Sequence, residues 1–401
     1  MVRQPLQHRP SIMDMPSLAR RLAPVPIGAR GQTLLIMVAG LAIVCGGCSP
    51  TPRATPKRAP ITGAERVLVV INSRSAASDS IGRYYAKRRG IDATHMLRLV
   101  LPVDDEINEV AFQTDLVSPV RSAIAALPVR IDFIVLTAGV PIRVARKNGY
   151  SVDALLSGMN LSIAPMVGMD SVWLSRFRNP YYNADVPFSS DRFGIFLVTR
   201  LACAVTADCL ALVDRSIDAR ASRGPFFFDA TPLRPAVDGY AATNRLLYAA
   251  AFRLQTKTFD VQIDTTPAFI APNSPVMGYA SWGSNDSKFD SVAYHAIRFL
   301  PGALAETFVS TSARTFGPTV GGQSRIVDLI AQGVTGVKGY VSEPYTIALA
   351  NPDILFDRYT RGANLAEAFY AASFMVLWKD LVVGDPLCAP YAMFPEPSFD
   401  R

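Results

Sequence analysis

Histidine is scarce in this sequence, and its scarcity limits the chemistry that the chain can perform. The 401 residues include three histidines, His8, His95 and His295. A metal site built on several histidines is therefore excluded, whereas a carboxylate site for calcium is not. The motifs GxSxG and HExxH, the P-loop and the full GxGxxG are also absent. We predict no metal site and no cofactor. We place His95 at the edge of a strand and His295 in a strand, and we interpret both as structural. A Cys–His pair such as His295 with Cys388 stays open.

Cysteine is also rare, with five residues in the chain. So few cysteines exclude a small scaffold that is held together mainly by disulfides. Cys203 and Cys209 flank the expected start of a helix. The sequence leaves open whether these two residues form a disulfide or remain free thiols.

The uncharged apolar run near the N-terminus is too short to cross a membrane. It covers residues 33–44, TLLIMVAGLAIV, whereas a transmembrane helix needs about twenty residues. Arg30 precedes the run and the small pair Gly46-Gly47 follows it, which is typical of a secretory signal peptide. We therefore predict a signal peptide over residues 1–47.

The residues after that run predict a lipid anchor. Gly46-Gly47-Cys48 resembles the lipobox of bacterial lipoproteins, with Cys45 standing where leucine is usual. In such signals the cysteine becomes the lipidated first residue of the mature chain, so we predict lipidation of Cys48. An ordinary signal that is cleaved nearby and an uncleaved anchor are the alternatives.

Positive charge is concentrated before residue 61. Residues 1–47 hold five arginines against one acid, Asp14, and residues 48–60 add three basic residues without an acid, out of a net charge of +7. The basic balance therefore does not indicate a nucleic-acid partner. Residues 48–65 are proline-rich and predict an extended tether. We expect the membrane as a partner through the N-terminal lipid, other envelope proteins as candidate partners, and localisation in the cell envelope.

From residue 66 onward, short apolar runs alternate with helical patterns. This alternation predicts an α/β fold with a mostly parallel sheet that is covered by helices on both faces. Residues 146–191 form an irregular excursion, and the two halves of the folded part are predicted at 66–225 and 226–401. The expected strands cover residues 66–71, 96–100, 131–137, 193–199, 226–229, 276–281, 307–311 and 336–341. The expected helices cover residues 78–89, 108–126, 207–220, 239–254, 325–331 and 363–373.

Candidate site residues follow the expected strands. Ligands of open parallel sheets bind beyond the carboxyl ends of the strands, which all lie at one edge. The binding candidates are Ser75, Arg143, Asp153 and Trp282. The catalytic candidates are Ser284, Asp286, Ser312, Glu343 and Asp385. We expect Ser75, Arg143, Asp153, Trp282, Ser312, Glu343 and Asp385 to gather at this edge. In the structural alternative, Ser75 caps a helix, the carboxylates of Glu343 and Asp385 accept hydrogen bonds in turns, and Trp282 is buried in the core.

A set of segments resembles a known family. The segments are INSRSAASDSIGRYYAKRRGI (71–91), IVLTAGVPIRV (134–144), SVDALL (151–156), NPYYN (179–183), LVTRL (197–201), GVTGVKGYVSEPY (333–345), ILFDRYTRGANLAEAFY (354–370) and VVGDPLCAPY (382–391). They are similar to an exported bacterial family that occurs in genomes with the exosortase/PEP-CTERM sorting system. The resemblance spans nearly all of residues 66–391. It implies export and carries no activity, because none is established for that family.

The distal half is also similar to the caspase-like, three-layer fold of gingipain-type cysteine peptidases. In those peptidases one strand ends in His-Gly and a later strand ends in the nucleophilic cysteine. The corresponding strand ends here read Ser281-Trp282-Gly283 and Ser310-Thr311-Ser312. Histidine and cysteine are both missing, so cysteine-peptidase chemistry is not implied, and a serine in place of the cysteine would need a base.

Two functions follow from these patterns. The first is an exported, lipid-anchored envelope protein that acts as a non-catalytic or degenerate peptidase-like binding module in protein sorting or surface assembly. The alternative is a hydrolase with a site built from serine and aspartate. A hydroxyl and a carboxylate within hydrogen-bond reach in one site would favour the hydrolase.

Overall fold

The computed structural model describes most of the chain after the tether. The described residues are 63–145, 149–161, 177–232 and 238–392. Contacts within the chain separate Met1–Lys57 from Arg58–Arg401, and every described residue belongs to the second unit. The predicted signal peptide, Cys48 and almost all of the tether lie outside the described residues.

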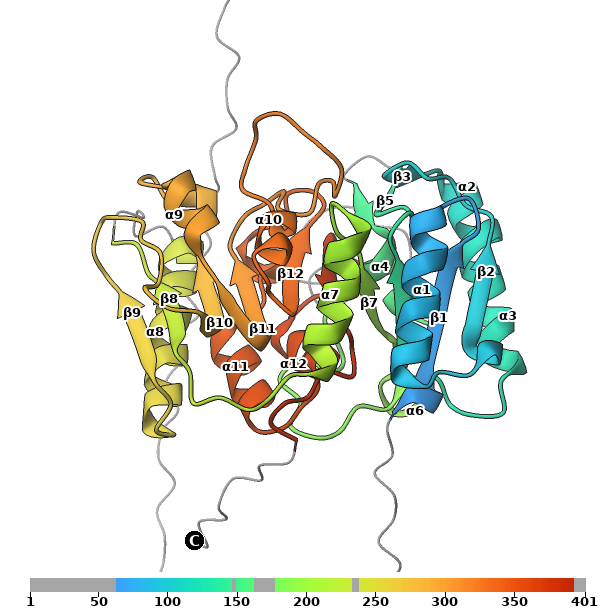
Figure 1. Ribbon diagram of the computed structural model, residues 1–401, viewed down its shortest axis with the longest axis horizontal. Coiled ribbons are helices and arrows are strands. Elements are labelled where there is room, and N and C mark those ends of the chain that lie inside the picture. The colour runs from blue at the N-terminus through green and yellow to red at the C-terminus, as the bar shows by residue number, and fades with distance from the viewer. Residues whose placement is uncertain (1–62, 146–148, 162–176, 233–237, 393–401) are drawn as a thin grey trace, which may run out of the picture. The chain divides into compact units, whose positions relative to one another are not determined.

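A ten-stranded sheet forms the centre of the described part (Figure 1). Strands β2, β1, β4 and β7 are mutually parallel, and so are β12, β11, β10, β8 and β9. Between these groups, β13 is antiparallel to β12 and is parallel to β7 at one residue pair, Val383 with Arg200. In spatial order the strands are β2 (Met96–Leu99), β1 (Val67–Asn72), β4 (Phe133–Thr137), β7 (Leu197–Leu201), β13 (Asp380–Val383), β12 (Gly336–Tyr340), β11 (Phe299–Thr307), β10 (Val276–Ser281), β8 (Phe226–Asp229) and β9 (Val261–Asp264).

Helices pack on both faces of this sheet, which the side chains of β1 make clear. Val69 and Ile71 belong to the same apolar cluster as Ile81 of α1 (Ala76–Arg89), whereas Leu68 and Val70 belong to a second cluster. That second cluster includes residues of η3 (Phe112–Val117) and α3 (Ser118–Ala126). Because both faces are covered, central strands such as β1 and β4 are almost continuously apolar and show no regular polar alternation. The α/β class with a mostly parallel, two-sided sheet is thus confirmed.

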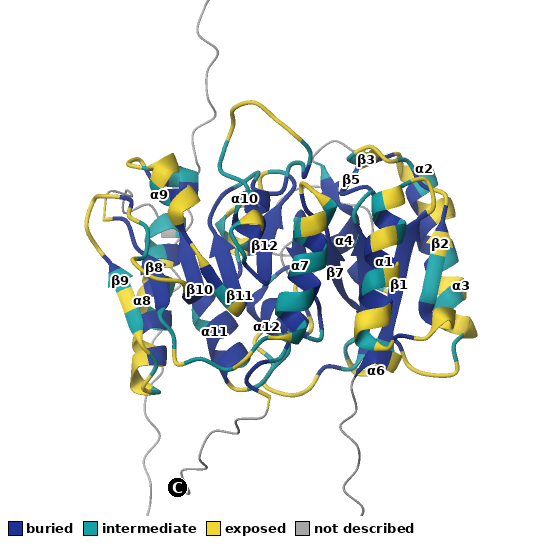
Figure 2. Ribbon diagram, viewed as in Figure 1, coloured by how far each residue is buried: buried dark blue, intermediate teal, exposed yellow. Residues whose placement is uncertain are grey.

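The remaining helices surround the two strand groups. In Figure 2 the strands are largely coloured as buried, and exposed residues lie on the outward surfaces of helices such as α1 and α8. The longer ones are α7 (Thr206–Ile217), α8 (Asp238–Thr256), α11 (Pro352–Thr360) and α12 (Leu365–Ala372). The shorter ones are η1 (Ala64–Arg66), η2 (Ala93–His95), α2 (Glu109–Ala111), α4 (Val152–Ser157), α6 (Ser190–Phe193), η4 (Gly283–Asn285), α9 (Ser291–Ala296), α10 (Ile326–Ala331) and η5 (Thr346–Ala348).

A second, three-stranded sheet lies beside the first strand group. It consists of β3 (Glu106–Ile107), β5 (Arg143–Val144) and β6 (Tyr150–Ser151). Segments that follow β4 also contact segments that follow β11 and β12. Arg143 Nη1 donates to the carbonyl of Arg314 at 2.7 Å, and Ser342 Oγ donates to the carbonyl of Gly149 at 2.8 Å. These hydrogen bonds join the loops of the two strand groups.

Several predicted elements differ from those in the structure. The expected strand at 307–311 is wrong, because β11 ends at Thr307 and the chain turns where Val309 N donates to Thr307 O. β11 instead begins at Phe299 and includes Pro301-Gly302. The register between β10 and β11 shifts at this point, because Val276 pairs with Phe299 and Gly278 pairs with Leu304. A bulge accommodates a proline that would interrupt a regular ladder.

The expected helix at 108–126 is divided in three. Between α2 and α3 the chain forms a π-helix, η3, and Pro119 occupies the first turn of α3. Proline has no N–H to bond to the preceding turn and its ring crowds that turn, so the regular α-helical pattern is interrupted before it, where η3 lies. His295, which the sequence placed in a strand, lies instead in α9.

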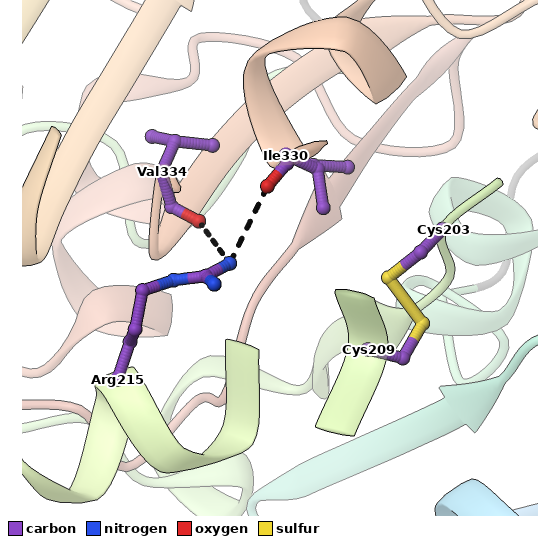
Figure 3. The surroundings of a disulfide bond; sticks show 5 residues. All are labelled: Cys203, Cys209, Arg215, Ile330 and Val334. Atoms are coloured by element: carbon purple, nitrogen blue, oxygen red, sulfur yellow. Dashed lines mark hydrogen bonds between the residues drawn. A yellow bond between two sulfur atoms is a disulfide. The ribbon is translucent and has the colours of Figure 1, made fainter. Parts of the chain in front are cut away.

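A disulfide joins Cys203 and Cys209, one of the two alternatives that the sequence left open. Cys203 follows β7 and Cys209 lies in the first turn of α7, so the bond holds the start of the helix next to the strand end. Figure 3 shows Arg215 of the same helix, whose Nη2 donates to the carbonyls of Ile330 and Val334 at 3.4 and 3.2 Å. α7 is therefore tied to the second strand group as well.

Candidate functional site

The two candidate serine nucleophiles are engaged in structural hydrogen bonds. Ser312 is 1% exposed, and its Oγ accepts from Tyr340 N at 3.3 Å. Ser284 Oγ accepts from Ser324 N at 2.9 Å, while Ser324 Oγ accepts from Ser284 N at 3.1 Å. Both hydroxyls therefore stabilise turns after β10 and β11.

No histidine of the described residues is positioned as a base for these serines. His95 is buried, and its Nδ1 is bonded to the carbonyl of Val67 at 2.9 Å. His295 is exposed, its Nδ1 lies 2.6 Å from the carbonyl of Ser291, and its Nε2 lies 3.8 Å from Asp328. A serine hydroxyl is a weak nucleophile unless an adjacent base activates it. Within the described ranges the structure thus contains no serine–histidine pair. Cys388, the other member of the open Cys–His alternative, is buried and hydrogen bonded to Tyr359 at 3.5 Å.

Asp153 forms a buried ion pair with Arg200. Arg200 Nε donates to Asp153 Oδ1 at 2.9 Å, and its remaining donors reach the carbonyls of Val140 and Pro141 at 3.1 Å each. Burial raises the pKa of Asp153, and the guanidinium opposes that rise. The pair holds α4 against the end of β7 and the turn after β4. The Nε, Nη1 and Nη2 atoms of Arg200 all donate hydrogen bonds within the fold.

The other binding candidates also have structural partners. Ser75 accepts from Ser78 N at 3.2 Å and caps α1, and Arg143 donates from Nε to Glu106 at 3.0 Å. Trp282 is 1% exposed, and its Nε1 donates to Asn244 Oδ1 at 3.0 Å. Glu343 is exposed, and its Oε1 accepts from Tyr345 N at 3.0 Å. Loop contacts therefore explain these residues without a ligand.

Asp385 does not lie with the candidates that follow β11 and β12. Because β13 is antiparallel to β12, its carboxyl end lies where β12 begins, and Gly384 is next to the carbonyl of Thr335. There Asp385 is fully buried and accepts from Tyr85 OH at 2.8 Å and from Arg89 Nε at 2.7 Å. The expected gathering of all seven residues is therefore wrong for Asp385. The strand direction that separates it from Glu343 was not predicted.

The structure instead aligns four polar residues that the sequence patterns did not single out. Register pairs place Asp264 of β9 beside Asp229 of β8, Asp229 beside Ser281 of β10, and Ser281 beside Thr307 of β11. These residues are the last of their strands, and all four are buried, with exposed fractions of 8%, 1%, 0% and 0%. Neighbours in register on a parallel sheet point to the same face. We call this set the polar row.

Asp229 is the unusual member of the polar row. Neither of its carboxylate oxygens has a hydrogen-bond partner, and the Oγ1 of Thr307 has none either. By contrast, Asp264 accepts from Thr266 N at 3.1 Å and from Thr266 Oγ1 at 3.0 Å. Asp286, which follows η4, accepts from Lys288 N at 2.7 Å. Burial, together with the charges of Asp264 and Asp286, raises the pKa of Asp229 to about 8.

A sequence signal for this row was present. Two of the four strands, β8 and β10, carry a polar residue directly at the end of an apolar run, FFFD (226–229) and VMGYAS (276–281). The candidates predicted from the sequence lie at least one residue after the ends of the strands, and therefore do not include Asp229 and Ser281. Nothing in the sequence alone shows which terminal residue lacks a partner, because partners come from other elements.

The described residues show neither a metal-binding cluster nor a membrane-spanning helix. No group of three or more histidine, cysteine, aspartate or glutamate side chains in these ranges is arranged to hold a metal ion. Among the same residues, no helix combines the length and the apolar character needed to cross a membrane.

Comparison with known proteins shows a distant structural likeness. No protein-family model matches the chain, and no curated protein matches it significantly. A solved structure described as a protease matches with a TM-score of 0.45 and 13% sequence identity, over 82% of this chain and 78% of that chain. The α/β class stated above follows from the sheet and helix layers of the chain itself.

Proposed function

We propose that this chain is an exported, lipid-anchored envelope protein that works as a binding module and performs no hydrolysis. One observation carries the second part of the proposal. The hydroxyls of Ser284 and Ser312 accept hydrogen bonds from the backbone, and neither has a histidine beside it in the described residues. Hydrolysis through an activated serine requires such a base.

Export and anchoring are supported by separate features. The apolar run at 33–44 and the Gly46-Gly47-Cys48 sequence favour a lipoprotein signal. The disulfide between Cys203 and Cys209 also favours export, because disulfides persist mainly in oxidising compartments. An anchored binding module fits the predicted accessory role in protein sorting or surface assembly.

One observation favours the alternative, a hydrolase with a site built from serine and aspartate. The pKa of Asp229 is raised to about 8. Carboxyl groups with pKa values near neutrality are frequent among catalytic acids and bases. The polar row also contains two hydroxyl groups, those of Ser281 and Thr307.

Activity-based labelling distinguishes the two functions. The full-length protein, purified in detergent, is treated with a fluorophosphonate probe for serine hydrolases and an epoxide probe for cysteine hydrolases. We expect no labelling above that of heat-denatured protein. The matched variants are Ser281→Ala, Ser284→Ala and Ser312→Ala. Labelling of the wild type that disappears in any one of these variants contradicts the binding-module proposal and supports the hydrolase.

A further inference from the structure

The carboxylate of Asp229 is buried at the end of β8 without a partner. The residue is 1% exposed, and both Oδ1 and Oδ2 lack hydrogen bonds. Burying a carboxylate is unfavourable unless hydrogen bonds or an opposite charge compensate it. Buried polar groups are rarely left unsatisfied, so an exception of this kind points to a missing partner.

The surroundings of Asp229 add negative charge. Two other aspartates, Asp264 and Asp286, act on its carboxyl group, and their negative charges raise its pKa. Asp264 is its neighbour in register on β9, and Asp286 follows η4 at the end of β10. Neither acid is compensated by an ion pair within the described ranges, since both accept only from neutral donors there. Asp264 and Asp286 therefore contribute negative charge that no ion pair neutralises there, and a bound cation would also favour the ionised form of Asp229.

Aromatic rings lie next to the cluster. Tyr279 is two residues before Ser281 on β10, on the same face, and its ring is stacked with Phe227 at 6.2 Å between centroids. Tyr279 pairs in register with Phe227, and Ser281 pairs with Asp229, so the side chains of Tyr279 and Asp229 lie on the same face of the sheet. In a separate group of rings, Tyr294 contacts Phe289 at 5.6 Å and Phe289 contacts Phe269 at 5.1 Å between centroids. Carboxylates combined with aromatic faces suit ammonium and guanidinium groups.

A divalent metal ion suits the cluster less well. Calcium takes about six to eight oxygen ligands, and magnesium needs near-ideal octahedral geometry. Here Asp264 is turned toward Thr266, and Asp286 is turned toward the backbone of residue 288. In the described residues no group of three acidic or other ligating side chains is arranged for a metal. An organic cation needs only the unpartnered carboxylate and the rings.

We propose that Asp229, Asp264, Asp286 and Ser281, here named the strand-end acid site, bind an organic cation through its ammonium or guanidinium group. This inference rests on the proposed binding function and specifies the ligand class for it. The guanidinium or ammonium donates to the free oxygens of Asp229, and Asp264 and Asp286 supply further negative potential. Exposed residues at 265–268 and at 287–288 follow Asp264 and Asp286 in the chain, and a ligand would reach the site past these segments. The cation can come from a basic side chain of a peptide or from a free small molecule.

Calorimetric titration of the full-length protein in detergent tests the inference. The ligands are the peptide acetyl-Ala-Arg-Ala-amide, the same peptide with neutral citrulline in place of arginine, and free methylguanidinium. The variants are Asp229→Asn and, as the matched control, Asp290→Asn. Asp290 is exposed and caps α9, a role that asparagine also performs. A charge-assisted hydrogen bond contributes roughly 1.5–3 kcal/mol, so we expect at least about tenfold weaker binding in Asp229→Asn.

Each outcome bears on the inference. If both the arginine peptide and methylguanidinium bind, the cationic group is sufficient for binding. If only the arginine peptide binds, the ligand is a peptide. Both results support the inference. Equal binding of the citrulline peptide, equal binding by Asp229→Asn, or no binding in any arm overturns it. If circular dichroism shows that Asp229→Asn is unfolded, the wild-type comparison of arginine with citrulline decides. Probe labelling that depends on a serine, with cation binding intact, removes the proposed function and leaves the inference standing.

Discussion

Arg89, the last residue of α1, donates from Nε to Oδ2 of Asp385 at 2.7 Å and so joins two residues that are 296 positions apart. Asp385 is fully buried and also accepts from Tyr85 of the same helix at 2.8 Å. This contact ties the first helix of the described part to the turn after the last strand. The role of Asp385 in this structure is therefore to hold the fold together.

Breaking this contact should destabilise the protein. We expect Asp385→Asn to lower the free energy of unfolding by about 3 kcal/mol, because the arginine would lose its charged partner in a mostly buried place. Chemical denaturation monitored by circular dichroism measures the change. The control is Arg88→Gln, whose partner Asp214 is partly exposed, and the expected loss there is below about 1 kcal/mol. Equal stability of wild type and Asp385→Asn would argue against a structural role.

Stability should depend on pH through Asp229. Its pKa is about 8 in the folded protein, against 3.8 for an ordinary aspartate side chain in water, so the folded state binds the proton more tightly than the unfolded state. The stability that this proton contributes is present below about pH 4 and is lost as the pH rises toward 8, at up to about 1.4 kcal/mol per pH unit. Asp264, Asp286 and Tyr279 are the titratable groups next to it.

Asp229→Asn removes this dependence, so its melting temperature should rise relative to that of the wild type between about pH 5 and pH 8. Thermal denaturation across that range is the measurement. Glu343→Gln, which changes an exposed carboxylate, should follow the wild type at every pH. If the Asp229→Asn curve runs parallel to the wild-type curve, the buried carboxyl group is not protonated as described.

The disulfide should contribute to stability. Replacing Cys203 and Cys209 by serine should lower the free energy of unfolding by about 2 kcal/mol, as expected for a short closed loop. Denaturant titration compares this double variant with Cys388→Ser as a control for loss of a buried thiol. Mass spectrometry after alkylation without reductant should leave both cysteines unmodified. Their alkylation in the denatured, unreduced protein would show that the bond is absent.

Lipidation of Cys48 is testable in cells. Metabolic labelling with an alkyne analogue of palmitate should mark the wild type, and Cys48→Ala should lose the label because the acceptor is gone. Cys45→Ala serves as the control and should keep the label, since Cys45 precedes the predicted cleavage site. Label that persists in Cys48→Ala rejects the lipoprotein interpretation.

Particular elements show how far the sequence could be interpreted. The run at 66–71 predicted β1 within one residue, and residues 226–229 predicted β8 without error, because buried parallel strands are continuously apolar. The position of β11 was predicted wrongly. A Pro-Gly pair such as Pro301-Gly302 usually interrupts a strand, whereas in this sheet a bulge accommodates it. His295 was assigned to a strand although it lies in a short helix.

The candidate residues divide in a similar way. Trp282 and Ser312 do follow strands, but the sequence could not show that Trp282 bonds to Asn244 or that Ser312 accepts from Tyr340. Asp229 was passed over because a polar residue at the end of an apolar run does not by itself show whether its side chain has a partner. Its missing partner became visible only when residues of β9, β10 and η4 were placed around it.

The sequence by itself determined the α/β class and the alternation of strands and helices. These properties depend on local hydrophobic patterns, and all the residues that make up such a pattern belong to one continuous segment of the chain. Only the tertiary structure decided the strand order, the antiparallel direction of β13 and hence the place of Asp385, and the isolation of the Asp229 carboxylate. Those properties depend on which distant segments pack together, and burial and pairing between them are set by the whole fold rather than by any single run of residues.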